Sequence, residues 1–466
     1  MTTKIQKGIR RKPDLDTVYS INADGSRNML QPADVKGRWH TRKNLIFAAL
    51  IAFYVIVPWI RVGGAPILRF DVPNRTAYIV GNTFTREDFY LVFFLITGFG
   101  FALFAVTSLL GRVWCGFACP QTVFLEGVYR RIEVWIEGDR NARLRRNQGA
   151  WTFDKLWRKV AKQLAFILLT FGITHTLLAY FMPVEEMIPA ILNGPSGHWL
   201  AFSWTLALSA VIYFDFAWFR EQFCVIICPY GRLQSALIDN DSVVIGYDEK
   251  RGEPRGPKGR VDGDCIDCGS CVNVCPTGID IRNGLQLECI GCTNCVDACD
   301  SIMKQVGRKE GLIRYDSLRG FQGNGHRWLR PRVFLYIGLA LLGLTVFGFT
   351  ASKRTSFEAT SLRARGMPYT LEEARIQNLY SIHLQNKSTT KAEYTVEPFV
   401  SEPVTTPVEW RVASEKLEIE PLGEATISVF AFVSRDAYRQ PFPVGIKVSD
   451  LAAQEVQIVE LTFRGP

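Results

Sequence analysis

Long apolar segments alternate with charged connections through the first three quarters of the chain. A helix needs about 20 residues to cross a hydrocarbon core of about 30 Å, and five segments approach or reach that length. The pattern predicts five membrane-spanning helices, at about residues 44–60, 89–110, 161–182, 199–219 and 333–350. The fourth carries Asp215, which we expect to face protein or to lie near the end of the span, because an ionisable group is costly in lipid.

The hydrophobic pattern changes after about residue 356. Short stretches with a period of two, such as AEYTV, ATISVFAFV and VQIVELTF, are separated by turn-forming residues. Such stretches, repeated over about 100 residues, are typical of an antiparallel β-sandwich of the immunoglobulin type. Docking or assembly is the plain expectation for this part, since a fold alone does not define a function.

Charge indicates the orientation in the membrane. The 466 residues are 48% hydrophobic and 21% charged, with a net charge of +9. Most of the basic excess lies beside the apolar segments, which indicates membrane topology rather than a nucleic-acid partner. The N-terminal tail and the connection after the second span are rich in Lys and Arg, although the connection after the first span also carries four arginines. The positive-inside rule predicts a cytoplasmic N-terminus and a C-terminal domain outside.

The twelve cysteines all lie between Cys115 and Cys299, in connections predicted to be cytoplasmic. Regular spacing in a reducing compartment indicates thiolate-bound metal rather than disulfides. Eight of them form two runs of C-x2-C-x2-C-x3-C, the spacing of bacterial two-cluster ferredoxins, in which the fourth cysteine of each run binds the other cluster. The sequence therefore predicts two [4Fe-4S] clusters. The predicted ligands are Cys265, Cys268, Cys271 and Cys299 for the first, and Cys289, Cys292, Cys295 and Cys275 for the second.

A zinc module is the alternative for these runs, but zinc takes four ligands per site and rarely uses this spacing twice. Gly269, Gly278 and Gly291 leave room for backbone amides to approach the sulfurs. Asp300 stands where the second run would usually have a proline, and it is expected to affect only the exit from that turn.

The remaining four cysteines form two copies of C-x3-C-P, one after the second span and one after the fourth. On a helix, the two cysteines of each copy would share a face, so four thiolates could converge at one site. Soft thiolates suit Cu(I), an iron–sulfur cluster or zinc, whereas the plainer alternative is that these are small buried residues at helix ends. The four are Cys115, Cys119, Cys224 and Cys228.

The predicted fold class is multidomain. An α-helical membrane protein with about five transmembrane helices carries an inserted two-[4Fe-4S] ferredoxin domain and a C-terminal all-β immunoglobulin-like sandwich. Basic residues in the connection at 130–159 are interpreted as a cytoplasmic anchor, with docking of an electron donor as the alternative. The expected parts are a tail at 1–43, four spans and the first C-x3-C-P at 44–219, a cytoplasmic loop with the second C-x3-C-P and the ferredoxin domain at 220–332, the fifth span at 333–350 and a periplasmic domain at 351–466.

Taken together, the doubled C-x3-C-P, the two ferredoxin runs, the last span and the β-rich tail resemble the cytochrome c oxidase accessory proteins called CcoG, also FixG or RdxA. The resemblance covers essentially the whole chain; NapH-like membrane ferredoxins share the cysteines but lack the β tail. It implies a multi-pass protein of the bacterial inner membrane that acts in assembly of cbb3-type oxidase. It also implies an oxidoreductase that reduces Cu(II) to Cu(I), with a copper chaperone, a copper transporter or the oxidase assembly machinery as partner.

Three functions remain open from the residues. The first is this copper-reducing assembly factor, in which the C-x3-C-P cysteines receive copper because Cu(I) prefers thiolates. The second is an electron-transfer subunit that passes electrons from quinol or a soluble donor to a partner enzyme without copper. The third is a membrane scaffold with structural clusters. The electron donor is not readable from the sequence, and a homodimer is compatible with it.

Overall fold

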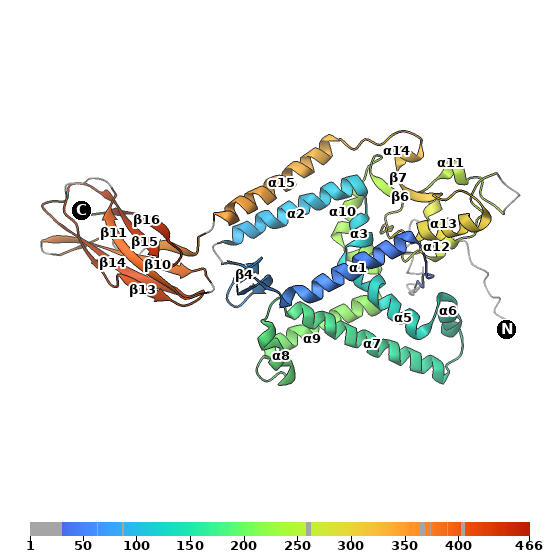
Figure 1. Ribbon diagram of the computed structural model, residues 1–466, viewed down its shortest axis with the longest axis horizontal. Helices are drawn as coiled ribbons and strands as arrows, with labels where there is room; N and C mark the ends of the chain where they lie inside the picture. The colour runs from blue at the N-terminus through green and yellow to red at the C-terminus, as the bar shows by residue number, and fades with distance from the viewer. Residues whose placement is uncertain are drawn as a thin grey trace. The chain divides into compact units, whose positions relative to one another are not determined.

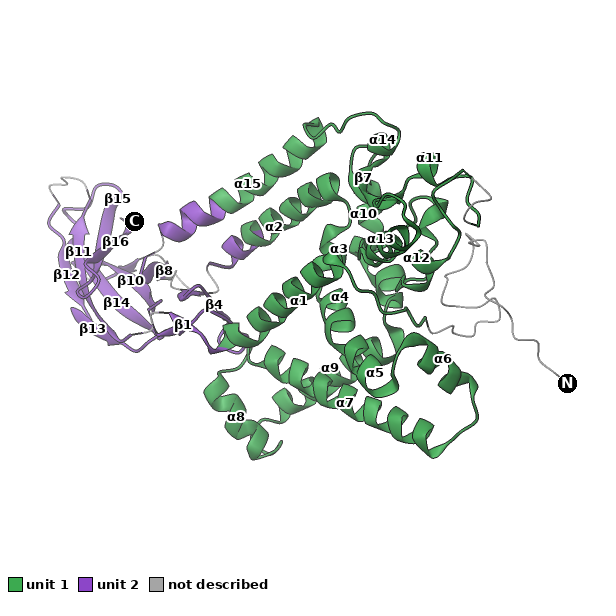
Figure 2. Cartoon of the chain, turned by 45° about the vertical axis from the view of Figure 1, so that its right-hand side comes forward, with its two compact units in different colours: residues 1–58, 94–345 green, residues 59–93, 346–466 purple. Residues whose placement is uncertain are grey.

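The computed structural model describes residues 30–62, 64–85, 88–257, 262–353, 355–362, 369–372, 374–388, 390–401 and 406–466. The first 29 residues of the predicted N-terminal tail therefore lie outside the described residues. The chain divides into two compact units, which Figure 2 colours separately. Unit 1 holds residues 1–58 and 94–345, and unit 2 holds residues 59–93 and 346–466.

The five predicted spans are confirmed as apolar helices in the described part of the chain (Figure 1). The third begins eight residues earlier than predicted, at Phe153 instead of 161. Thr152 caps this helix by accepting a hydrogen bond from the backbone amide of Lys155 at 3.2 Å, so the helix starts in a charged segment that hydropathy does not detect. The helices are α1 (Arg38–Ile56), α2 (Phe89–Leu110), α7 (Phe153–Leu178), α9 (Trp199–Phe214) and α15 (Pro331–Ser352).

Small and polar residues bring the spans of unit 1 together. A Cβ atom on Gly343 of α15 would lie 3.0 Å from the Cα atom of Gly98 in α2. The hydroxyl groups of Thr174 in α7 and Ser209 in α9 share a hydrogen bond of 2.8 Å. Such contacts hold membrane helices together where lipid removes the hydrophobic drive for association. Asp215 opens the π-helical turn η4 (Asp215–Phe219) that ends the fourth span, as expected.

Short elements fill the connections of unit 1. After the second span these are α3 (Val113–Phe117), α4 (Pro120–Phe124), the π-helical turn η3 (Leu125–Tyr129), α5 (Arg130–Glu137) and α6 (Arg140–Gln148); after the third span, α8 (Val184–Leu192); and after the fourth, the π-helical turn η5 (Phe223–Ile227) and α10 (Pro229–Leu237). The predicted basic anchor at 130–159 is thus largely helical.

The region with the eight ferredoxin cysteines is closed by two antiparallel strands, β6 (Val243–Tyr247) and β7 (Ile313–Ser317). Between them lie α11 (Glu249–Gly252), α12 (Ser270–Asn273), the 3-10 turn η6 (Ile281–Asn283) and α13 (Asn294–Val306), and α14 (Leu318–Phe321) follows. The apolar side chains that join the cysteines in one core are Ile245, Tyr247, Ile279, Ile281, Val296, Met303, Leu312 and Ile313.

Two antiparallel sheets form the C-terminal part of unit 2, which confirms the immunoglobulin-like sandwich. One sheet has the order β12-β14-β10-β8, with β9 beside β10, and the other has the order β13-β11-β15-β16. Alternate residues of β10 are buried, as a period of two requires. The strands are β8 (Phe357–Leu362), β9 (Thr370–Leu371), β10 (Arg375–Asn386), β11 (Ala392–Val400), β12 (Glu409–Val412), β13 (Lys416–Ile419), β14 (Glu424–Ser434), β15 (Phe442–Asp450) and β16 (Glu455–Phe463).

The connection after the first span is folded into small sheets, which the sequence did not predict. Its strands belong to unit 2, where buried Lys387 forms ion pairs with Asp88 at 3.2 Å and with Glu358 at 2.5 Å. The ring of Phe84 stacks on Phe347 with centroids 6.2 Å apart. The strands are β1 (Arg61–Val62), β2 (Ala65–Pro66), β3 (Leu68–Asp71), β4 (Thr76–Ile79) and β5 (Asn82–Phe84).

Candidate functional site

The eight ferredoxin cysteines gather around two cavities within unit 1. The lining of both cavities is otherwise mostly apolar. One cavity is lined by Cys265, Cys268, Cys271 and Cys299, and the other by Cys275, Cys289, Cys292 and Cys295, with Cys271 between the two. In each cavity, three cysteines of one run meet the fourth cysteine of the other run, which is the arrangement that a two-cluster ferredoxin needs. The residues therefore fit two [4Fe-4S] groups, and the individual ligand assignment stays a prediction.

Backbone amides point at the sulfurs of the second cavity. Gly291 has φ +68°, and its amide donates a hydrogen bond to the thiol of Cys289. The thiol of Cys275 accepts from the amides of Thr277 and Ile279. Such donors stabilise a thiolate and tune the potential of a bound iron–sulfur group. Gly269 and Gly278 also have positive φ, of +68° and +76°, which a residue with a Cβ atom rarely adopts.

Burial disfavours the charged form of these thiols. It raises the pKa of Cys271 and of Cys299 to about 12, and that of Cys292 to about 11. In the metal-free chain these thiols are therefore protonated at neutral pH. Because thiolates are the metal ligands, assembly of a cluster must release protons from this core.

Asp300 lies inside α13. Because an aspartate stands where a proline would break the helix, the helix continues to Val306. Its carboxylate is buried and accepts a hydrogen bond from the backbone amide of Gly311 at 2.8 Å. Asp300 therefore ties the end of the cysteine-bearing helix to the connection before β7, a role beyond the expected effect on the turn.

The helical arrangement expected for each C-x3-C-P is wrong. Cys115 lies in α3, but Cys119 follows that helix and precedes α4 with φ −65° and ψ 126°. Cys224 lies in η5, and Cys228 precedes α10 with φ −64° and ψ 110°. The following proline causes the break, because it disfavours the helical conformation in the residue before it and suits the first position of the next helix.

The four C-x3-C-P cysteines nevertheless come together. Burial is the largest cause that raises the pKa of Cys115 to about 11, and the nearby thiols of Cys119 and Cys228 also raise it. The pKa of Cys224 is also raised by burial first and then by the other three thiols. Gln234, which is fully buried on α10, donates from its amide nitrogen to the sulfur of Cys115 at 3.3 Å.

In the described ranges, no three Cys, His, Asp or Glu side chains lie close enough to hold a single metal ion. The thiolates of an iron–sulfur cluster bind different irons, so they need not converge on one point.

The two cysteine regions touch through their backbones. A Cβ atom on Gly116 in α3 would lie 2.8 Å from the carbonyl carbon of Gly291 and 3.2 Å from the amide nitrogen of Cys292. Arg112, directly before α3, donates to the carbonyl oxygen of Cys289 at 2.8 Å and to that of Gly231 in α10 at 3.3 Å. The C-x3-C-P centre is thus packed directly against the loop that carries Cys289 and Cys292.

The first span is also bound to the ferredoxin region. The carboxylate of Asp297 in α13 accepts hydrogen bonds from the backbone amides of Trp39 and His40, at 3.2 and 2.7 Å. Buried Lys43 donates to the carbonyl oxygen of Cys292 at 3.3 Å and to the side chain of Asn294 at 2.6 Å. These contacts fix the start of α1 against the second cysteine run.

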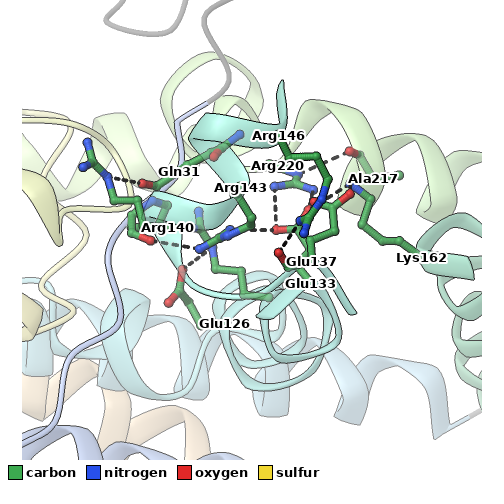
Figure 3. A network of polar contacts seen from close by, with 12 residues as sticks. Gln31, Glu126, Glu133, Glu137, Arg140, Arg143, Arg146, Lys162, Ala217 and Arg220 are labelled. Atoms are coloured by element: carbon green, nitrogen blue, oxygen red, sulfur yellow. Dashed lines mark hydrogen bonds and ion pairs between the residues drawn. The ribbon is translucent and has the colours of Figure 1, made fainter. Parts of the chain in front are cut away.

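A buried network of charges lies beside this site, and sequence reasoning missed it. Figure 3 shows Arg143 and Arg220 directed at Glu133 of α5. Arg220 donates to the two carboxylate oxygens of Glu133 at 2.5 and 3.2 Å, and Lys162 lies 3.7 Å away. Burial alone would raise the pKa of Glu133, but Arg220 and Lys162 lower it to about 2. Part of the predicted basic anchor is therefore buried and ion-paired, and only its charge density could have indicated that.

Family comparisons assign iron–sulfur domains to the cysteine regions. A model described as a 4Fe-4S dicluster domain matches residues 219–262 and 257–318. A model described as a 4Fe-4S binding domain matches residues 91–143, which contain the first C-x3-C-P. The model of the IG-like fold at the C-terminus of FixG matches residues 347–466.

Curated relatives share most of the chain. The nitrogen fixation protein FixG of Rhizobium meliloti is 34% identical over 426 residues, which cover 80% of this chain and 80% of the relative. Protein RdxA of Cereibacter sphaeroides is 35% identical over 381 residues, covering 78% of this chain and 80% of the relative. Protein RdxB of the same organism is 35% identical over 396 residues, covering 79% and 82%. With its iron–sulfur domains, its apolar helices and its C-terminal sandwich, the chain belongs to the FixG/RdxA family of iron–sulfur electron-transfer proteins.

Proposed function

We propose that this protein delivers single electrons to Cu(II) and so supplies Cu(I) during maturation of a cbb3-type oxidase in the bacterial inner membrane. The packing of α3 against the Cys289–Cys292 loop carries the proposal, because it joins an electron-transfer module to a second group of soft ligands. Bound clusters would supply one-electron transfer at the two ferredoxin cavities. The partner is then a copper chaperone, a copper transporter or the oxidase assembly machinery.

The C-x3-C-P group is the proposed acceptor side. Cys115, Cys119, Cys224 and Cys228 offer thiolates, which favour Cu(I) over Cu(II) and therefore make reduction of a bound copper substrate more favourable. Gln234 orients the thiol of Cys115 through the hydrogen bond to its sulfur. Arg112 donates hydrogen bonds to the carbonyl oxygens of Cys289 and Gly231. It thereby fixes the position of the C-x3-C-P group relative to the second cysteine run.

The proposed orientation places the N-terminus and all cysteines in the cytoplasm and the C-terminal sandwich in the periplasm. Lysine and arginine in the connections support it, since the positive-inside rule counts these residues. The reduced thiols that the cysteine regions need are also typical of the cytoplasm.

A second candidate is electron transfer to a partner enzyme without copper. The match of residues 91–143 to a 4Fe-4S binding domain favours it, because Cys115 and Cys119 lie in this match. In this case the four C-x3-C-P cysteines hold a third cluster.

Anaerobic purification of the full chain separates the two candidates. Iron and sulfide analysis should return about eight irons per chain for two clusters and about twelve for three. The protein, reduced with dithionite and then freed of it, should convert Cu(II) to Cu(I) with electrons from its own clusters, measured with a Cu(I)-specific chelator. Cys115→Ser with Cys228→Ser should abolish this activity and leave about eight irons, whereas Ser235→Ala on α10 should change neither.

Loss of about four irons in the Cys115→Ser/Cys228→Ser variant would favour the third cluster. Unchanged copper reduction in the same variant would refute the copper proposal. Clusters that never change redox state in a midpoint titration would refute electron transfer altogether.

A further inference from the structure

A cavity of about 240 Å³ in unit 1 lies beside the N-terminal turns of α1, and the proposed function does not use it. The first turns of α1 form one wall, with His40, Lys43, Asn44 and Phe47. The opposite wall comes from η3, α5 and α6. Since a water occupies about 30 Å³ of liquid volume, the cavity is large enough for a phosphate group and more.

The lining is strongly basic. Two carboxylates, Asp34 and Glu126, stand against Lys36, Lys43, Arg130, Arg131 and Arg143. Glu221 and Glu133 pair with Arg130 and Arg143 from outside the lining, so Lys36, Lys43 and Arg131 supply the positive charge that attracts an anion.

Some of these cations keep free donors. The side chain of Arg130 is 8% exposed. Its Nε atom forms an ion pair with Glu126, and its Nη2 atom forms one with Glu221. Its Nη1 atom has no hydrogen-bond partner among the described residues, and neither has Nε of Arg143, whose side chain is 4% exposed. Both side chains line the cavity, so their guanidinium charge acts on an anion bound there.

Both walls of the cavity also carry apolar side chains. Phe47, Val134 and Trp135 line it, and Trp135 is 78% exposed. Trp151 and Phe153, at the start of the third span, are 74% and 85% exposed. Exposed aromatic side chains at span ends are typical of the level of lipid headgroups.

From this combination we propose that the cavity binds the phosphate headgroup of an anionic phospholipid, with its acyl chains on the side of Trp135. Basic pockets beside transmembrane helices bind such headgroups. A bound lipid would contact Lys43, which holds the Cys292 carbonyl, so the lipid would brace the first span against the second cysteine run. The proposal does not depend on copper reduction.

The test uses the delipidated full chain in detergent, with phosphatidylglycerol, phosphatidylcholine or inorganic phosphate added. Lys36→Gln with Arg131→Gln removes two cations that line the cavity. Neither side chain forms a hydrogen bond or an ion pair with another described residue. Arg145→Gln with Arg232→Gln is the control, because both are exposed outside the cavity and the change in charge is the same. Thermal melting without lipid checks that all variants fold.

Phosphatidylglycerol should raise the melting temperature of the wild type and of the control, and native mass spectrometry should detect it bound. In the lining variant, its affinity should fall about thirty-fold, since each cation near a headgroup contributes about 1 kcal/mol. Equal effects of phosphatidylcholine would overturn the proposal in favour of unspecific apolar binding. Equal stabilisation by inorganic phosphate would assign the cavity to a free anion instead, and unchanged affinity in the lining variant would place the lipid elsewhere.

Discussion

The backbone contact between α3 and the second cysteine run predicts a defect in Gly116→Ala. The added methyl group would overlap the carbonyl oxygen of Gly291 and lie 2.8 Å from its carbon. These are backbone atoms of a residue with φ +68°, so they cannot move aside as a flexible side chain would. The helix that carries Cys115 must therefore shift away from the Cys289–Cys292 loop.

The cost follows from overpacking. An extra methyl group in a well-packed core costs about 1–3 kcal/mol. For a domain of about 150–250 residues, 1 kcal/mol corresponds to about 2–4 °C in melting temperature. We therefore expect Gly116→Ala to melt several degrees below the wild type and to reduce Cu(II) more slowly after reduction by dithionite.

Gly100→Ala in α2 is the matched control. No atom lies within 4 Å of the added Cβ, and alanine is favoured over glycine in a helix by about 1 kcal/mol. Thermal melting in detergent and the initial rate of Cu(I) formation are the two measurements. If Gly116→Ala melts and reacts like Gly100→Ala, the close approach of α3 to the cysteine loop is refuted.

Further predictions concern the charge network and the spans. Glu133→Gln should cost about 3–5 kcal/mol, because it leaves Arg220 buried without a full counter-charge. The pKa of Glu133 is lowered from 4.5 to about 2, so its contribution to stability is complete above pH 4.5 and is lost as the pH falls towards 2; melting of Glu133→Gln should depend less on pH in that window. Gly343→Ala should lower the melting temperature by separating α15 from Gly98, and Gly338→Ala, which meets no atom within 4 Å, should not. Equal melting of Gly343→Ala and Gly338→Ala would contradict the packing of α15 against α2. Melting of Glu133→Gln at the wild-type temperature would contradict the buried ion pair with Arg220.

Hydropathy predicted the spans well because burial in lipid demands uninterrupted apolar length. It could not find the start of α7, since that end is fixed by the Thr152 cap in a charged segment. Spacing likewise indicated the ferredoxin runs, because each cluster needs its thiols in that local order. The break within each C-x3-C-P was foreseeable from Pro120 and Pro229, whose effect on the preceding residue is local.

The small sheets after the first span and the buried charge network could not be read from the sequence. The turn between β4 and β5 uses Val80 and Gly81, both with positive φ, where Asn-Gly would have signalled a hairpin. The pairing of Glu133 with Arg220 joins residues 87 positions apart, and nothing local distinguishes these charges from solvent-exposed ones. Such contacts depend on the tertiary fold.

The ion pair between Lys387 and Asp88 joins positions 299 residues apart. During synthesis, the strands after the first span therefore leave the ribosome long before the sandwich that completes their unit. The ion pair of Asp88 with Lys387 and the stacking of Phe84 on Phe347 can form only after the last helix and the C-terminal strands have been made. A truncated product would lack these contacts, so the C-terminal sandwich completes the compact unit to which the strands after the first span belong.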